Sequence, residues 1–144
     1  MQKEVQKILR SVGLKVTPQR SAILGILMES KNHPGVEDLY KEIKQNHPSI
    51  SLATVYKTVY TLKEKGLVQE LPVSFNKVAY DGNVDFHPHL VCSSCNTIVD
   101  LPSFNQSIPE AWLREASSRH DYHVDSASVI LYGVCPECKE NHIN

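Results

Sequence analysis

The chain has 144 residues, of which 41% are hydrophobic and 22% are charged. This composition is that of an ordinary globular protein with one domain or two small ones, and it excludes a low-complexity chain. No apolar run approaches the length of a membrane span, and the first residues lack the apolar core of a signal peptide. We therefore expect a cytoplasmic protein without a membrane part, in which cysteine thiols stay reduced.

The formal net charge of −1 hides an uneven distribution of charge along the chain. Residues 1–80 carry 12 Lys and Arg against 7 Asp and Glu, a net charge of +5. Residues 81–144 carry 3 against 9, a net charge of −6. A basic first half suits contact with nucleic acid and an acidic second half suits cation binding, although uneven charge alone is common.

Three helices are predicted at the start of the chain. Apolar residues at helical spacing between positions 5 and 12 predict the first helix, and Gly13 is a natural stop. Thr17 is placed to cap the second helix, with Pro18 at its first position. The amphipathic segment Val36–Ile43 predicts the third helix.

A fourth predicted helix is polar on the face that it does not bury. Ser51 caps this helix, Leu52–Lys65 forms it, and Gly66 ends it. Its predicted buried face consists of Val55, Val59 and Leu62. The remaining face carries short polar residues, one lysine and neighbouring tyrosines: Ala53, Thr54, Tyr56, Lys57, Thr58, Tyr60 and Thr61. Hydroxyl groups and a cation suit a helix that lies in the major groove of DNA.

A β-hairpin is predicted after the fourth helix. Its two strands are Leu67–Leu71 and Lys77–Tyr80, and residues 74–76 close the turn between them. Helices followed by a hairpin form the order of a winged helix, which binds DNA. A small helical bundle without a nucleic-acid role is the alternative that this pattern leaves open.

The second half of the chain changes from helical to strand-like spacing. Leu90–Val91 and Ile98–Leu101 are predicted strands, Gln106–Arg119 is a predicted helix, and Ser128–Val134 is a β-rich run. A lone core is marginal in about 60 residues, and a metal or a partner chain is usually needed at that size.

Four cysteines form two C-x2-C pairs. The first pair is Cys92 and Cys95, and the second is Cys135 and Cys138. Four thiolates at this spacing suit a closed, tetrahedral zinc site. The alternatives are reduced thiols without a metal, or a redox-active pair. The redox motif belongs to a strand-to-helix turn in a βαβ unit, which the sequence does not predict.

Harder ligands lie close to the first cysteine pair. Alternation along a strand would point the imidazoles of His87 and His89 to one side. Asp81 and Asp100 are candidate carboxylates, although each is also typical of a solvated loop. Such nitrogen and oxygen ligands suit Fe, Mn or Zn. His33 precedes a proline and, taken alone, is typical of a turn.

With these motifs in view, the chain resembles the ferric uptake regulator superfamily along nearly its whole length. The resemblance rests on the segments Thr17–Arg20, Ser51–Tyr56, His87–Cys95 and Tyr132–Cys138. It implies an α+β protein, a homodimeric, metal-activated transcriptional repressor of operator DNA. The implied organisation is a winged-helix DNA-binding domain over residues 1–81, a hinge over residues 82–86, and a metal-binding α/β dimerisation domain over residues 87–144.

The resemblance also implies particular site residues. The structural Zn²⁺ ligands would be Cys92, Cys95, Cys135 and Cys138. The ligands of a regulatory Fe²⁺ or Mn²⁺ would be His33, Asp81, His87, His89 and Asp100. The candidate DNA contacts are Arg20, Ser51, Ala53, Thr54, Tyr56 and Lys57.

Within the superfamily the chain is most similar to the peroxide-responsive repressors. Those carry a short carboxylate at the position of Asp100, where iron sensors typically carry Glu. A further metal site of other members is expected to be missing, because Pro88 and Ala127 stand at two of its ligand positions. The branch implies that peroxide acts by iron-catalysed oxidation of His33 and His87. The alternative is an iron or manganese uptake regulator without peroxide sensing.

An enzyme is the alternative from another functional class. It would be a small thiol oxidoreductase, or a metallohydrolase that uses His87, His89 and Asp100. No plausible nucleophile or general base accompanies these three residues in the sequence. We therefore expect a regulator and no enzyme.

Overall fold

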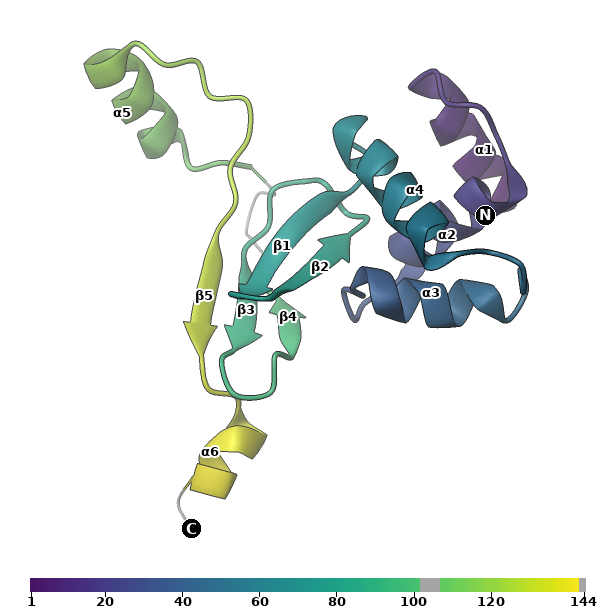
Figure 1. The fold of residues 1–144 in the computed structure, drawn as a ribbon. Coiled ribbons are helices and arrows are strands. Elements are labelled where there is room, and N and C mark those ends of the chain that lie inside the picture. The colour runs from purple at the N-terminus through teal and green to yellow at the C-terminus, as the bar shows by residue number, and fades with distance from the viewer. Residues whose placement is uncertain (102–106, 143–144) are drawn as a thin grey trace. The chain divides into compact units, whose positions relative to one another are not determined.

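The computed structural model describes residues 1–101 and 107–142. The chain divides into two compact units, Met1–Val84 and Asp85–Asn144 (Figure 1). No helix in the described ranges has both the length and the apolar character that a membrane crossing requires.

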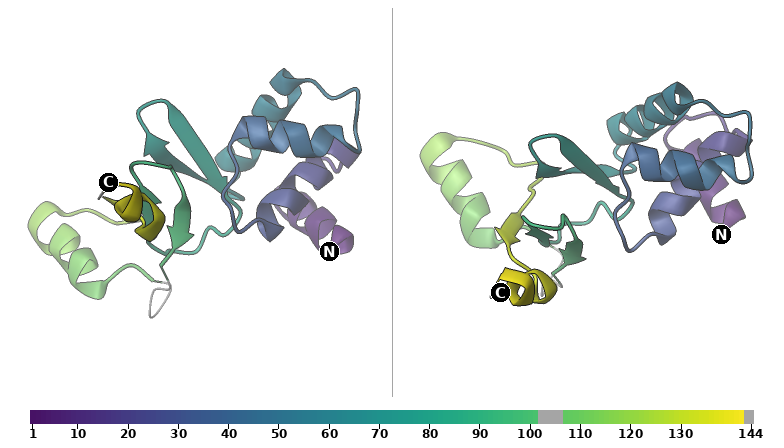
Figure 2. Two further views of the ribbon diagram at one scale, coloured as in Figure 1. Left: turned by 90° about the horizontal axis from the view of Figure 1, so that it is seen from below. Right: turned by 60° about the horizontal axis from the view of Figure 1, so that its bottom comes forward.

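The first unit begins with four helices, which gather into one bundle (Figure 2). They are α1 (Gln2–Ser11), α2 (Pro18–Glu29), α3 (Val36–Lys44) and α4 (Leu52–Glu64). The predicted caps are confirmed. The side chain of Thr17 accepts a hydrogen bond from the backbone N–H of Arg20 at 3.2 Å, and that of Ser51 accepts one from Thr54 at 3.1 Å. Each such cap stabilises a helix by about 1 kcal/mol.

The helices pack around one apolar core. Its most buried members are Val5, Leu9, Ile23, Leu24, Leu27, Leu39, Ile43, Val55, Val59 and Leu62. The expected inward face of α4 is therefore confirmed. The outward placement of Thr58 is wrong, since only 9% of this residue is exposed. Thr58 stands three residues after Val55 and four before Leu62, so helical geometry brings it onto their buried side.

An antiparallel hairpin follows α4, which completes the order expected of a winged helix. Strands β1 (Gln69–Ser74) and β2 (Lys77–Asp81) pair across a turn at Phe75 and Asn76. The first strand begins two residues later than predicted. Leu67 instead closes the end of α4, because its backbone N–H donates to the carbonyl of Leu62 at 3.0 Å.

The second unit contains a three-stranded sheet with the order β4-β3-β5. Its strands are β3 (His89–Cys92), β4 (Ile98–Asp100) and β5 (Ile130–Gly133). Strand β3 pairs antiparallel with β4 and parallel with β5. The parallel pairing places Cys92 opposite Gly133, and therefore brings together segments far apart in the sequence (Figure 1).

The second unit also has two helices among its described residues, and both differ from expectation. The helix predicted over 106–119 is α5 (Glu110–His120), while Gln106 lies outside the described residues. Pro109 takes the cap position with φ −53° and ψ 129°, outside the helical region, so the helix begins after it. The short helix α6 (Pro136–His142), directly after β5, was not predicted.

The second unit has a small apolar core. Among residues 85–101 and 107–142, the buried apolar side chains are those of Val91 and Cys92. None of the residues of α5 is buried. Large apolar side chains remain exposed instead: Leu90, Val99, Trp112, Tyr122, Leu131, Tyr132 and Val134. This is consistent with a unit that needs a metal or a partner chain.

Candidate metal centres

The first cysteine pair lies where β3 ends and turns towards β4. Cys92 is the last residue of β3, and Cys95 lies in the turn that follows. The backbone N–H of Asn96 donates to the carbonyl of Cys92 at 2.8 Å. Asn96 has a φ of 62°, a left-handed conformation that asparagine tolerates better than most residues. The turn therefore brings the sulfur atoms of Cys92 and Cys95 close together.

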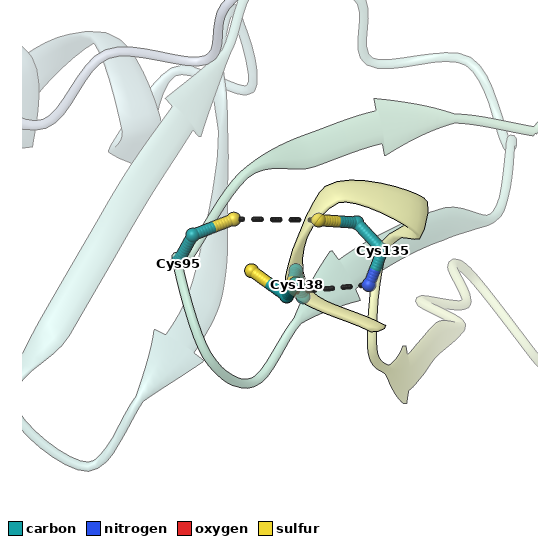
Figure 3. A group of neighbouring side chains, drawn as sticks. Cys95, Cys135 and Cys138 are labelled. Atoms are coloured by element: carbon teal, nitrogen blue, oxygen red, sulfur yellow. Dashed lines mark hydrogen bonds between the residues drawn. The ribbon is translucent and has the colours of Figure 1, made fainter. Parts of the chain in front are cut away.

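The second pair reaches the first through the parallel pairing of β3 and β5. The N–H of Ser93 donates to the carbonyl of Gly133 at 2.8 Å, just before Cys135. The Sγ atoms of Cys95 and Cys135 lie 3.8 Å apart, with Cys138 beside them on α6 (Figure 3). The four sulfur atoms all lie within 4.8 Å of one another.

The closeness of the four sulfur atoms indicates that the cluster suits a cation. The backbone N–H of Cys135, 3.3 Å from the sulfur of Cys92, lowers the pKa of the Cys92 thiol to about 6. The neighbouring Cys135 sulfur raises the pKa of the Cys138 thiol to about 12. Four thiolates so close together repel each other unless a positive ion lies among them. Zn²⁺ fits this donor set, since it prefers four sulfur ligands in a tetrahedron.

Candidate nitrogen and oxygen ligands, which are harder than thiolate sulfur, occur in both units. In the first unit, two of them form a pair. The Nε2 atom of His33 lies 3.3 Å from Oδ2 of Asp81, and this His33–Asp81 pair is almost fully buried. His33 lies in the loop between α2 and α3 and has a φ of 49°. Such a conformation is uncommon for a residue other than glycine, and it occurs at functional sites.

The backbone around the pair fixes its position. The N–H of Tyr80 donates to the carbonyl of Pro34 at 3.0 Å, which ties the His33 loop to β2. The N–H of Asn83 donates to Oδ1 of Asp81 at 2.8 Å. Next to Asp81, Gly82 lies directly against the backbone of α2, where a Cβ atom would be 2.5 Å from the carbonyl oxygen of Leu27.

The second unit holds a triad formed by His87, His89 and Asp100. The register of β3 and β4 places His89 opposite Asp100. Oδ1 of Asp100 lies 3.2 Å from Nε2 of His89 and 3.4 Å from Nε2 of His87. The two imidazole rings are 4.3 Å apart, so both histidines lie on one side, as alternation predicts.

The second ring nitrogen of His87, which does not face Asp100, has a backbone partner. This Nδ1 atom lies 2.7 Å from the carbonyl oxygen of Asp85, which leaves Nε2 as the atom that faces Asp100. A hydrogen bond of this kind orients a metal-binding imidazole. The pair offers one imidazole and one carboxylate, and the triad offers two imidazoles and one carboxylate. These donors fit Fe²⁺ or Mn²⁺, which favour nitrogen and oxygen ligands.

The candidate DNA contacts come from the starts of two helices, α2 and α4. Five are exposed on the first turns of α4, namely Ser51, Ala53, Thr54, Tyr56 and Lys57. The hydroxyl of Ser51 is engaged in capping α4, where it lies 2.8 Å from the hydroxyl of Thr54. Arg20 is half-buried on α2, and its guanidinium donates to the carbonyl of Lys15.

Sequence reasoning missed two residues that shape these centres. The hydroxyl of Thr97 lies 3.0 Å from the sulfur of Cys95 and lowers the pKa of that thiol. Gly82 allows the close approach of chain segments beside Asp81. A glycine directly after a predicted strand and a candidate ligand was the available signal for the second residue.

Comparisons with known proteins find one family along most of the chain. Residues 11–132 match the model of the ferric uptake regulator family. The peroxide-responsive repressor PerR of Staphylococcus aureus (strain Mu50) is 35% identical over 134 residues, which cover 92% of this chain and 87% of the relative.

Two solved structures are similar in both sequence and fold. The peroxide stress regulator of Campylobacter jejuni is 38% identical with a TM-score of 0.73, over 94% of this chain and 97% of the other. The ferric uptake regulator of Vibrio cholerae, whose DNA-binding domains are described as rearranged, is 28% identical with a TM-score of 0.71. The match covers 90% of this chain and 98% of the Vibrio chain.

Proposed function

The chain belongs to the ferric uptake regulator family, and from this premise we propose that it is a peroxide-sensing, metal-dependent transcriptional repressor. It binds operator DNA as a homodimer, in the cytoplasm. The observation that carries the proposal is the division of the harder ligands between two units, the His33–Asp81 pair in one and the triad in the other. Neither set is a complete coordination sphere by itself.

The four cysteines have a structural role in this proposal. Cys92, Cys95, Cys135 and Cys138 hold Zn²⁺, which fastens the turn after β3 to α6. The unit has few buried apolar residues of its own among those described. Zinc therefore supplies stability that packing does not, on the order of 10–16 kcal/mol of apparent binding free energy in small zinc peptides.

The pair and the triad together bind one regulatory ion, Fe²⁺ or Mn²⁺. Fe²⁺ bound there supplies the electrons that reduce peroxide, whereas Mn²⁺ does so poorly. His33 and Asp81 engage the ion from the DNA-binding unit, while His87, His89 and Asp100 engage it from the other unit. These residues thereby restrain the hinge over residues 82–86 and hold the two DNA-binding units of a dimer at one separation.

Histidine oxidation reverses this restraint. The imidazole carbons of His33 and His87 are the groups that take up oxygen. An oxidised imidazole is a weaker ligand, so the hinge is released. Only a fraction of the dimers then has the geometry that fits DNA. The apparent affinity for DNA falls in proportion to that fraction.

The DNA-binding surface in this proposal is centred on α4. Thr54, Tyr56 and Lys57 are exposed on this helix, whose opposite side is anchored in the core. Ser51 and Ala53 lie at its start, where backbone N–H groups and the helix dipole favour a phosphate. Arg20 adds a cation from α2. The net charge of +5 over residues 1–80 suits a polyanion.

Dimerisation is assigned to the second unit. Strand β5 lies at one edge of the sheet and exposes Leu131 and Tyr132, of which 50% and 56% are accessible. Val134 follows, and 40% of it is accessible. An apolar edge strand is usually covered in the working protein. A second copy of the chain is the occupant that a two-fold repressor requires.

The test compares operator binding by three forms of the full chain: zinc alone, zinc with Fe²⁺, and zinc with Mn²⁺. The operator is a duplex that the Mn²⁺ form selects from a random-sequence library. We expect tight binding by both loaded forms and weak binding by the zinc-only form. After low peroxide, the Fe²⁺ form alone should release DNA. Equal resistance of both loaded forms would favour an iron or manganese uptake regulator without peroxide sensing.

A further inference from the structure

Cys95 is the most accessible of the four clustered cysteines. It is exposed, whereas Cys92 is buried and Cys135 and Cys138 are half-buried. Cys95 lies in the turn after β3, and its sulfur is 3.8 Å from that of Cys135 (Figure 3). A small solute such as hydrogen peroxide therefore reaches the sulfur of Cys95 most directly.

Thr97 supplies a side-chain hydrogen bond to this exposed sulfur. Its hydroxyl oxygen lies 3.0 Å from Sγ of Cys95. A thiolate has no proton to give, so the hydroxyl is the donor whenever Cys95 is a metal ligand. The buried sulfur of Cys92 accepts instead from a backbone group, the N–H of Cys135 at 3.3 Å. The hydroxyl at Cys95, unlike that backbone group, is a donor that a substitution can remove.

The surrounding backbone holds Thr97 in place for this contact. The carbonyl of Thr97 accepts the N–H of Cys92 at 3.0 Å, which closes the turn between β3 and β4. The next residue, Ile98, pairs with Val91 in the sheet. Branching at Cβ restricts the χ1 angle of threonine, so few orientations are open to the hydroxyl. The contact with Cys95 is therefore set by the fold of the turn.

A hydrogen bond to a thiolate lowers the reactivity of the sulfur towards peroxide. In that reaction the Cys95 sulfur attacks one oxygen of hydrogen peroxide with a lone pair. The S–O bond forms as the O–O bond breaks, hydroxide leaves, and the sulfur is oxidised by two electrons to a sulfenic acid. A donor that already engages the electron density of the sulfur raises the barrier to this attack. Partners of this kind, which bind a metal ligand from outside, tune the ligand.

We infer that Thr97 shields the Cys95 thiolate and thereby directs peroxide away from the zinc site. This rests on the proposed function, in which peroxide oxidises His33 and His87 while the zinc site survives the same signal. Cys95 is exposed in the turn, so its accessibility does not protect it. Its protection comes from the Thr97 hydroxyl. Thr97 acts through Cys95 and is thus a positioning residue that helps to set which ligands peroxide attacks.

The experiment measures zinc release from the zinc-only form of the full chain in excess hydrogen peroxide, followed with a chelating dye. Thr97→Val keeps the shape of the side chain and removes the hydroxyl. Release should be about three- to tenfold faster, the effect expected for one lost hydrogen bond. Thr97→Ser keeps the donor and should release zinc like the unchanged protein. Thr61→Val is the matched control, because the hydroxyl that it loses donates to the Lys57 carbonyl on α4 at 2.9 Å.

Two further readouts report on the sulfur itself. With Co²⁺ in place of zinc, the thiolate-to-metal charge-transfer band of Thr97→Val should move to longer wavelength. A sulfur without the hydrogen bond gives up an electron more easily, and Thr97→Ser should keep the original band. After brief exposure to peroxide, a probe for sulfenic acids should label Cys95 more strongly in Thr97→Val than in the unchanged protein.

Several outcomes would overturn the inference. Release from Thr97→Val at the unchanged rate, or from Thr97→Ser as fast as from Thr97→Val, would show that the hydroxyl is no shield. Loss of zinc from Thr97→Val before peroxide is added would show that the hydroxyl is needed to bind zinc instead. None of these measurements uses DNA. If the unchanged Fe²⁺ form keeps its operator after peroxide, the proposed peroxide sensing fails separately, whereas an unchanged chain that binds no zinc would reject both.

Discussion

Gly82 lies so close to Leu27 that a Cβ atom on residue 82 would be 2.5 Å from the Leu27 carbonyl oxygen. It would also be 2.8 Å from the backbone nitrogen of Met28. Both neighbours belong to the backbone of α2, so neither can move aside as a flexible side chain would. Any larger residue at position 82 must therefore displace the chain that carries Asp81.

We predict that Gly82→Ala weakens Fe²⁺ or Mn²⁺ binding and leaves zinc in place. The expected decrease in affinity is about 10- to 100-fold, as for other residues that orient metal ligands. Titration of the zinc-only protein with Mn²⁺, followed by electron paramagnetic resonance, measures the free ion directly. Zinc content is read from the same samples by elemental analysis.

Gly25→Ala is the matched control for this substitution. A Cβ at residue 25 would lie 3.9 Å from Val5, an ordinary van der Waals distance. The change should stabilise α2 by about 0.4–1 kcal/mol and leave Mn²⁺ affinity unchanged. Equal Mn²⁺ affinity in both variants would show that Gly82 does not position Asp81.

The contrast between Gly82 and the cysteines shows which parts of these centres the sequence could predict. A C-x2-C pair is a local pattern, because a single turn brings its two sulfur atoms together. The close approach of Gly82 to Leu27 joins residues 55 positions apart, and no local pattern encodes such an approach. For the same reason His33 by itself is typical only of a turn, and the resemblance was needed to assign it a metal.

Helix positions were predictable where a cap and a stripe of apolar residues agreed. Thr17 and Ser51 marked the starts of α2 and α4 correctly. Thr58 was placed wrongly, because a small polar residue on a buried stripe resembles a surface residue in sequence. The helix after Pro136 was missed, because its seven residues include no apolar stripe.

Cys92→Ser should cost the protein its zinc, its dimeric state and its DNA binding together. Cys92 ends β3, and its sulfur accepts from the N–H of Cys135, so this residue joins the two cysteine pairs. Elemental analysis, sedimentation and operator binding measure the three properties. Ser93→Ala, at the exposed neighbouring residue, should change none of them. A zinc-free Cys92→Ser dimer with full DNA binding would falsify the structural role.

Lys57→Ala should weaken operator binding without altering the metal content. Lys57 is exposed on α4, next to the exposed Tyr56. If its ammonium contacts a phosphate, the slope of log affinity against log salt falls by about one. A salt series of binding isotherms gives this slope. An unchanged slope and affinity would mean that α4 does not lie on the DNA.

Leu131→Asp should convert the dimer to a monomer at micromolar concentration. Half of the Leu131 surface is exposed on the edge strand β5, and a carboxylate there would be buried without a partner in a dimer. Sedimentation velocity measures the mass, and the single Trp112 reports folding. Leu131→Ile is the control, since it keeps the apolar surface. A Leu131→Asp dimer as tight as the unchanged one would place the interface elsewhere.

The last prediction separates a peroxide sensor from a plain metal sensor. Given low peroxide, the Fe²⁺-loaded dimer should gain the mass of one oxygen atom on the peptide that contains His33 or His87. The fraction of operator DNA that is released should equal the fraction of the dimer that is oxidised. The Mn²⁺ form should show neither change, because it holds the units together and reduces peroxide poorly.

Other residues of the same chain provide the internal controls for this measurement. His47 and His123 lie outside the pair and the triad, so their peptides should keep their mass. The four cysteines should also stay unmodified at that dose, because a zinc-bound thiolate is a weak nucleophile. Oxygen that appears first on Cys92 or Cys95 would instead indicate a redox switch based on the zinc thiolates. Equal responses of the Fe²⁺ and Mn²⁺ forms would exclude histidine oxidation as the signal.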